Sequence, residues 1–277
     1  MTETSAILDA YTDEHVHLKC AAPERQLYAI ANLKAWFSGK SIAEIDIPAC
    51  RAYSEARRGG LVGRPSKGAT IRRELSVLTS AANHAVKWKR LRADHVPIIE
   101  MPAASEPRNV YLERQELKDM IAAAEGEVKR FIRLSYYWGA RKSSVSGLTS
   151  EQIDFSSGTV NLHRHGDQRT NKRKPIVPLY DAIKPDVEWL MDQKKGVRLF
   201  KAYDHYQSFK AVCEKAGTPD DKRFPHILRH TRATHLLQDG VSIYDVAKLL
   251  GDTVSTVEKT YGHHSTAYLQ STTGFGI

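Results

Sequence analysis

A break in the helical pattern divides this chain in two. Residues 93–109 contain three prolines and show neither helical nor strand periodicity. Because proline lacks an amide hydrogen and interrupts helices, such a segment suits a tether between domains. The chain has 277 residues, 41% of them hydrophobic, which is enough for two cores of ordinary size. We therefore predict two domains, residues 1–100 and 111–277, joined by a linker at 101–110.

The expected fold class is mainly α-helical, with a small antiparallel β-sheet in the second domain. From Ser5 to about Leu91 the apolar residues recur at helical spacing, and we expect four helices there. Two further helices are expected over residues 113–124 and 128–138. From 153 to 177, β-branched residues alternate around turn signals, which indicates a sheet.

Helix returns near the C-terminus. Pro225 can occupy the first turn of a helix that ends at Gly240. The run Ser255–Glu258 has the form of a capping box, which predicts a short helix that begins there and carries Tyr261 in its second turn.

The balance of charge favours a polyanionic partner. The formal net charge is +9, and residues 57–92 hold ten Lys or Arg against one acid, Glu74. That density predicts phosphate contact, although a solvated basic helix is the alternative. The predicted DNA-binding side chains are those of Arg57, Arg58, Arg64, Lys67, Arg72, Arg73, Lys87 and Lys89.

Nothing in the sequence predicts a metal, a cofactor or a membrane. The three cysteines are far apart, with no spacing typical of zinc sites or disulfides. No window approaches the roughly 18 apolar residues that span a bilayer. We expect a cytoplasmic, nucleoid-associated protein.

Three short segments suggest a nucleophilic tyrosine. Gly139-Ala140-Arg141 comes first, His226-Ile-Leu-Arg229-His230 follows, and Tyr261 lies in a run from Leu249 to His264. Cutting a phosphodiester needs a nucleophile, fixed positive charge and a proton source for the leaving oxygen. A guanidinium suits the second role because its planar fork donates two hydrogen bonds to phosphate and stays protonated.

In order and spacing these segments resemble the tyrosine recombinase (phage integrase) family. Taken singly, each has a plainer interpretation: His226 and Arg229 as a solvated helix face, Arg141 as a residue binding helix carbonyls, and Tyr261 as a core aromatic. The resemblance implies that Arg141, Arg229 and His226 are catalytic and that Tyr261 is the nucleophile. Ser144 departs from the family, which usually has an acidic residue there.

The resemblance also implies a catalytic lysine on a hairpin of the small sheet. Lys172 is our first candidate for the acid that protonates the leaving oxygen, and Lys174 is the second.

Asp252 is the clearest departure, because the family usually has His or Trp there. A carboxylate would repel phosphate unless it is protonated or paired. We predict that Asp252 pairs with Arg229 or His226 as a positioning group, and that His263 or His264 supplies the missing donor.

The implied function is site-specific recombination of double-stranded DNA through a 3′-phosphotyrosyl intermediate, for integration or excision of a phage or mobile element. The implied architecture is a two-domain DNA clamp that acts as a homo-tetramer on DNA, with accessory DNA-bending or directionality proteins as possible partners. The alternatives are a type IB topoisomerase-like enzyme and a non-catalytic DNA-binding protein on the same fold.

Overall fold

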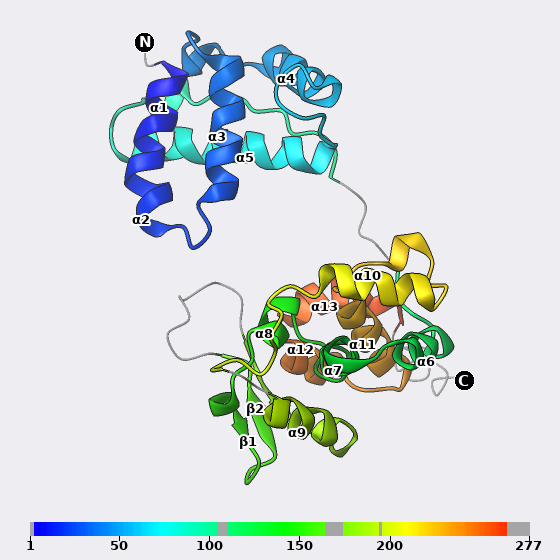
Figure 1. The fold of residues 1–277 in the computed structure, drawn as a ribbon. Helices are drawn as coiled ribbons and strands as arrows, with labels where there is room; N and C mark the ends of the chain where they lie inside the picture. The colour runs from blue at the N-terminus through cyan, green and yellow to red at the C-terminus, as the bar shows by residue number, and fades with distance from the viewer. Residues whose placement is uncertain (1–2, 105–109, 164–173, 194–195, 265–277) are drawn as a thin grey trace, which may run out of the picture. The chain divides into compact units, whose positions relative to one another are not determined.

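A computed structural model describes residues 3–104, 110–163, 174–193 and 196–264 of the chain. The chain forms two compact units, Met1–Glu106 and Pro107–Ile277 (Figure 1). Within the described residues the secondary structure is mainly helical, with one three-stranded antiparallel sheet in the second unit. The expected fold class is confirmed.

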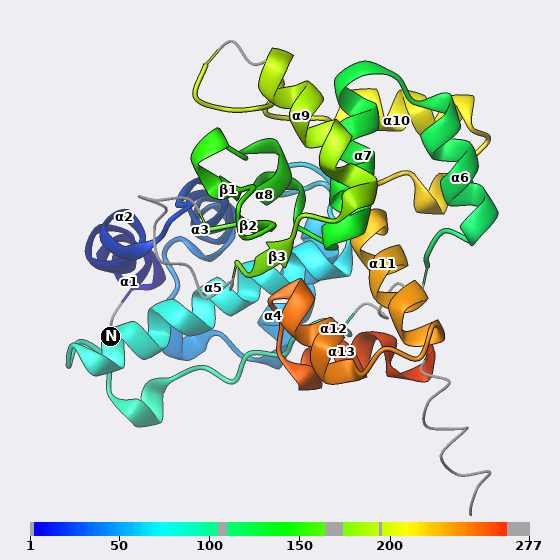
Figure 2. The ribbon, with the colours of Figure 1, turned by 90° about the horizontal axis from the view of Figure 1, so that it is seen from below.

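The first unit is helical. Its helices are α1 (Thr4–Tyr11), α2 (His17–Lys19), α3 (Glu24–Phe37), α4 (Ile47–Gly59) and α5 (Gly68–Lys87). A π-helical turn, Thr12–Val16, joins α1 to α2, so the described part of the unit holds the four helical runs that the sequence predicts. In Figures 1 and 2, α5 crosses the neighbouring α1 and α3, and apolar residues from all three, such as Leu8, Leu33 and Leu75, form the core.

The second unit contains the remaining helices and the sheet. The helices are α6 (Arg114–Ala123), α7 (Gly126–Trp138), α8 (Lys142–Ser146), α9 (Lys184–Gln193), α10 (Tyr206–Lys215), α11 (Ile227–Gln238), α12 (Ile243–Leu250) and α13 (Val254–Tyr261). Their main core includes the buried rings of Phe131 and Trp138 on α7 and the side chain of Leu228 on α11. The close packing of α7 on α11 brings two of the predicted motifs together.

The small sheet has the order β1 (Ile153–Asp154), β2 (Thr159–Asn161), β3 (Ile176–Pro178), with both pairs antiparallel. Val160 faces Val177 across the middle of the sheet, and both side chains are buried. The indole nitrogen of Trp138 donates to the carbonyl of Pro178 at 2.9 Å. This hydrogen bond ties β3 to the end of α7.

A second, smaller core in this unit joins α11, α12 and α13. Its buried members are Ala233, Leu237, Val246, Ala247, Leu250, Val257 and Tyr261. The aromatic ring of Tyr261 is thus part of a packed core, which fixes the direction of its hydroxyl group.

The predicted start of α13 is wrong. The hydroxyl of Thr253, not Ser255, caps this helix by accepting from the amide of Thr256 at 3.2 Å. Thr253 has extended backbone angles and directly precedes α13, so its side chain can reach the free amides of the first turn. The helix runs from Val254 to Tyr261, so Tyr261 is its last residue.

Candidate active site

Arg229 lies at the centre of the candidate site. It is on α11 and only 3% exposed. Its Nη1 donates to the carbonyl of Gly139 at 2.8 Å and to that of Leu250 at 2.9 Å. These carbonyls lie at the C-terminal ends of α7 and α12, where helix oxygens lack amide partners and carry partial negative charge. A buried guanidinium thus ties the ends of two helices together.

Arg141 and Arg229 share one carboxylate. Arg141 Nη2 donates to Asp252 Oδ1 at 2.9 Å, and Arg229 Nη2 donates to Asp252 Oδ2. Arg141 directly precedes α8, and Asp252 follows Gly251, whose left-handed backbone ends α12. The predicted pair of Asp252 with Arg229 is therefore present, and Arg141 completes it. Two cationic forks directed at the two oxygens of one anion also form an arrangement suited to phosphate.

Tyr261 is close to this charge cluster. Its hydroxyl is 2.9 Å from Nδ1 of His230, and its side chain is largely buried. Burial raises the pKa of Tyr261 to about 12, while the positive charges of Arg229 and Arg141 oppose that rise. The two arginines are thus close enough to the phenolic oxygen to stabilise its anion.

His226 and His230 stand one turn apart at the start of α11. His226 is the N-cap residue, and the two rings are perpendicular with centroids 4.9 Å apart. Removal from water lowers the pKa of His226, and the nearby His230, Arg229 and Arg141 lower it further. His226 is therefore disposed to be neutral, with a ring N–H that can donate to phosphate.

His230 has no role among the predictions made from sequence. A signal was available, because His230 follows His226 by four residues and therefore shares its helix face. What the sequence lacked was the position of Tyr261, which only the packing of α13 on α11 supplies.

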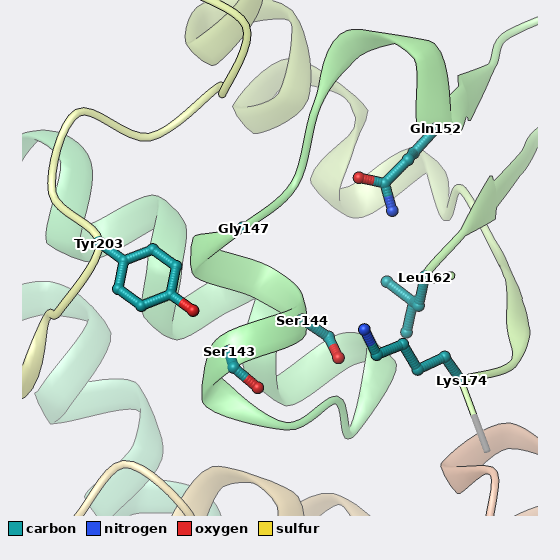
Figure 3. Close-up of a pocket in the computed structure, with 7 residues that line it drawn as sticks. All are labelled: Ser143, Ser144, Gly147, Gln152, Leu162, Lys174 and Tyr203. Carbon is teal, nitrogen blue, oxygen red and sulfur yellow. The ribbon is translucent and has the colours of Figure 1, made fainter. Parts of the chain in front are cut away.

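A cavity of about 180 Å³ contains the second lysine candidate. Its lining includes Lys174, Ser143, Ser144 and Gln152, and Figure 3 shows the Lys174 ammonium and the Ser144 hydroxyl pointing toward one another. Ser143 and Ser144 belong to α8, which begins directly after Arg141. The cavity therefore places Lys174, next to β3, beside the segment that carries the first arginine. Lys172 lies outside the described residues.

His263 follows Tyr261 on a 3-10 turn, Gly262–His264, and its side chain is exposed. The His264 side chain lies outside the described part of the chain. The donor role expected of these histidines stays a prediction.

In the first unit, the prediction that Arg57 binds DNA is wrong, because its side chain is buried. Its side chain is 1% exposed and forms a buried ion pair with Glu74, with Arg57 Nη2 2.7 Å from Glu74 Oε1. Further hydrogen bonds run from its guanidinium to the carbonyl of Arg64 and the hydroxyl of Ser66. Arg57 stabilises the fold and cannot contact a phosphate without unfolding its surroundings. The other seven are exposed: Arg58, Arg64, Lys67, Arg72, Arg73, Lys87 and Lys89.

No helix in the described ranges is long and apolar enough to cross a membrane. Within the same ranges, no group of three or more His, Cys, Asp or Glu side chains is arranged to hold a metal ion.

Comparisons with known proteins identify the family of the chain. The sequence profile of the phage integrase family matches residues 110–267. The chain is 25% identical over 300 residues to the tyrosine recombinase XerC of Mycobacterium leprae (strain TN), covering 96% of each chain. It is 24% identical over 292 residues to XerC of Mycobacterium sp. (strain KMS), covering 95% of this chain and 93% of that protein.

Solved structures share the fold. The Tn1549 transposon integrase, in complex with transposon right end DNA, is similar with a TM-score of 0.78 and 14% identity over 99% of each chain. The XerH site-specific recombinase, bound to its difH substrate in a pre-cleavage complex, is similar with a TM-score of 0.67 and 17% identity, covering 98% of this chain and 84% of that one. The chain therefore belongs to the phage integrase family of tyrosine recombinases.

Proposed function

We propose that this protein is a site-specific recombinase that cuts and rejoins double-stranded DNA through a 3′-phosphotyrosyl intermediate. The observation that carries the proposal is the convergence of Arg141, Arg229 and Tyr261, from three distant segments, on one small region of the second unit. The relatives named above are recombinases and integrases, and two of the similar structures hold DNA.

In this scheme Tyr261 attacks the scissile phosphorus, and the 5′ oxygen leaves. Arg141 and Arg229 bind the non-bridging oxygens and stabilise the extra negative charge of the transition state. His226 donates from its neutral ring to one of those oxygens and orients the phosphate.

A hairpin lysine, Lys172 or Lys174, protonates the leaving oxygen. Lysine can release a proton when its pKa is lowered, whereas arginine cannot. The energy of the broken bond is kept in the phosphotyrosyl link, so the free 5′ hydroxyl of a partner strand can reverse the reaction. Neither ATP nor a metal ion is needed for these steps, since side chains supply the cations and the proton.

The first unit, through its exposed lysines and arginines, would bind the duplex and help to place the scissile phosphate. We propose that four copies assemble on two DNA sites and that the substrate is an attachment site of a phage or another mobile element. Accessory DNA-bending or directionality proteins would set the outcome, and the protein would work in the cytoplasm at the nucleoid.

The test is covalent trapping on nicked suicide DNA that carries candidate attachment sequences. The unaltered protein should form a protein-DNA adduct, and Tyr261→Phe should abolish it while keeping DNA affinity. Tyr244→Phe, which changes an exposed tyrosine of α12, is the matched control. An adduct formed by Tyr261→Phe would show that another residue is the nucleophile.

Covalent trapping, together with assays of DNA relaxation and of strand exchange between two duplexes, separates the rival functions. A DNA-binding protein without catalysis forms no adduct with any sequence. A type IB topoisomerase-like enzyme forms the adduct and relaxes supercoiled DNA, but does not exchange strands between two duplexes. Recombinant products from two attachment sites support the recombinase.

A further inference from the structure

The Tyr261 hydroxyl has a hydrogen-bond partner to which the scheme above gives no role. Its oxygen lies 2.9 Å from His230 Nδ1, and the two ring centroids are 5.6 Å apart. His230 is on α11, and the Tyr261 ring packs in the core shared by α11, α12 and α13. The same three helices therefore hold both groups.

A buried phenol needs help to become a nucleophile. Tyr261 is 7% exposed. Burial raises the pKa of Tyr261 to about 12, so at neutral pH the oxygen keeps its proton. A neutral phenol attacks phosphorus poorly, and a neighbouring base that removes the proton during attack lowers the barrier.

We propose that His230 is the catalytic base that takes this proton, an inference that rests on the recombinase function. As the bond between Tyr261 Oη and phosphorus forms, the phenolic proton passes to His230 Nδ1 and the ring becomes an imidazolium. The bond from phosphorus to the 5′ oxygen breaks, and a hairpin lysine protonates that oxygen. In rejoining, the 5′ hydroxyl attacks phosphorus and returns its proton to the hairpin lysine, while the bond from phosphorus to Tyr261 breaks and the phenolic oxygen recovers its proton from His230.

The surrounding contacts favour His230 over the other candidate bases. Both oxygens of Asp252 already accept from guanidinium groups, so this carboxylate is engaged by the two arginines. His226 contacts the His230 ring at a right angle. The ring of Phe224 also packs edge-to-face against the His230 ring, with centroids 6.2 Å apart. These contacts keep Nδ1 directed at the tyrosine.

The sharpest test compares two substrates that differ in the leaving atom. In one the scissile 5′ oxygen is natural, and in the other it is replaced by sulfur, which leaves as a thiolate without a proton. Adduct formation is measured in single turnover at saturating DNA for the unaltered protein, His230→Asn and Lys174→Met. Asparagine places a polar atom near the position of Nδ1 but cannot accept a proton, so it separates the base from the hydrogen bond.

We expect His230→Asn to slow adduct formation by about 10²–10⁴-fold with either substrate, the usual contribution of a base. A variant that lacks the general acid should behave differently. With the sulfur substrate the leaving group needs no proton, so the rate of adduct formation by that variant should be restored. Lys174→Met should therefore be rescued by sulfur if Lys174 is the acid, and Lys172→Met is tested in parallel. His17→Asn, at an exposed histidine of α2, controls for the substitution itself.

The pH profile gives a second readout. A base must be neutral to accept a proton, so protonation of the base should slow adduct formation by the unaltered protein at acid pH. His226 and Tyr261 contact the His230 ring directly, and Arg141, Arg229 and Asp252 act electrostatically on both of these neighbours. His230→Asn should lose the acidic limb, whereas His226→Asn should keep it.

Rescue of His230→Asn by sulfur, or an unchanged rate with the natural substrate, would overturn the inference. So would loss of DNA binding or of the unfolding transition in both His230→Asn and His230→Gln, since the ring would then be structural. The recombinase function is judged separately, by the adduct of the unaltered protein and its loss in Tyr261→Phe.

Discussion

Arg229 shows why this position requires arginine. Its guanidinium is buried and binds the carbonyls of Gly139 and Leu250 and the carboxylate of Asp252. Burial lowers the pKa of Arg229, and the Asp252 carboxylate offsets part of that effect. The pKa of a guanidinium is so far above neutral pH that the group stays charged even when burial lowers its pKa. Its five N–H groups can donate to the carbonyls of helix ends and to an anion at the same time.

Asp252 is predicted to keep the side chains of Arg141 and Arg229 in the positions that bind phosphate, because it pairs with both. In Asp252→Asn the ion pairs become weaker hydrogen bonds, so we expect stability to fall by about 1–3 kcal/mol. DNA should bind more tightly because a negative charge beside the phosphate is removed, while adduct formation should fall by roughly 10-fold or more as the arginines lose their alignment. Thermal unfolding, DNA titration and single-turnover cleavage measure the three effects.

The matched control for Asp252 is Asp221→Asn, which removes one exposed carboxylate from the same unit. Its stability and cleavage rate should stay near those of the unaltered protein. If Asp252→Asn cleaves as fast as the unaltered protein, Asp252 has no positioning role.

Arg57 and Arg58 are neighbours in sequence with different predicted effects. Arg57→Met leaves Glu74, whose side chain is 3% exposed, as a buried charge without its cation. We expect a loss of about 3–5 kcal/mol in the free energy of unfolding, seen by denaturant titration. Arg58→Met, at an exposed position, should cost less than about 0.5 kcal/mol but weaken DNA binding. Equal stability of the two variants would contradict this assignment.

At the scale of elements, helix ends build the site. The end of α7 supplies Gly139 and, two residues later, Arg141, while the end of α12 supplies Leu250 and, two residues later, Asp252. Each helix is closed by a glycine with left-handed backbone angles, at Gly139 and at Gly251. The chain therefore turns sharply at both places and directs the following polar side chain back toward α11.

Gly139→Ala should disturb this junction. The backbone φ at Gly139 is +57°, and an added Cβ would lie 2.5 Å from Leu250 Cδ2. We expect a loss of about 2–4 kcal/mol from the left-handed backbone and the overlap together, and slower adduct formation because the carbonyl that binds Arg229 must move.

Gly217→Ala isolates the backbone part of that cost. Gly217 has a φ of +68° with nothing within 4 Å of an added Cβ, so about 1 kcal/mol is expected, with unchanged cleavage. Equal losses in the two variants would show that the overlap with Leu250 is relieved at no cost.

At the scale of the whole molecule, the two units have separate predicted tasks. We expect the second unit to carry the chemistry and the exposed cations of the first to make sequence-independent contact with DNA. Electrostatic contact of this kind depends on salt, because each neutralised phosphate releases a counterion.

Arg73→Gln combined with Lys87→Gln should reduce the salt dependence of DNA binding. Both side chains are exposed on α5, and the slope of log K against log salt should fall in magnitude by about 0.9 for each phosphate that the variant no longer neutralises. Lys19→Gln combined with Lys40→Gln removes the same charge from exposed positions outside residues 57–92 and is the control. Equal slopes for the two double variants would argue against this surface.

Local chemistry let much of the molecule be predicted from sequence. Apolar periodicity predicted the four helical runs of the first unit, α6 and α7, because it records which faces are buried. Motif order indicated Arg141, Arg229 and Tyr261 as partners, and they lie close together. The capping-box form of Ser255–Glu258 predicts that α13 starts at Ser255, whereas the residue with the extended backbone that caps the helix is Thr253.

Long-range packing decided the rest. Ten basic residues in one segment look equivalent in sequence, yet Arg57 pairs with Glu74 inside the fold because α4 and α5 pack against each other. His230 became a partner of Tyr261 only when α13 packed on α11, and Asp252 acquired two arginines only when the ends of α7 and α12 met. Sequence determines which residues can form helices, caps and ion pairs, whereas the burial and distances that select among those possibilities exist only in the folded chain.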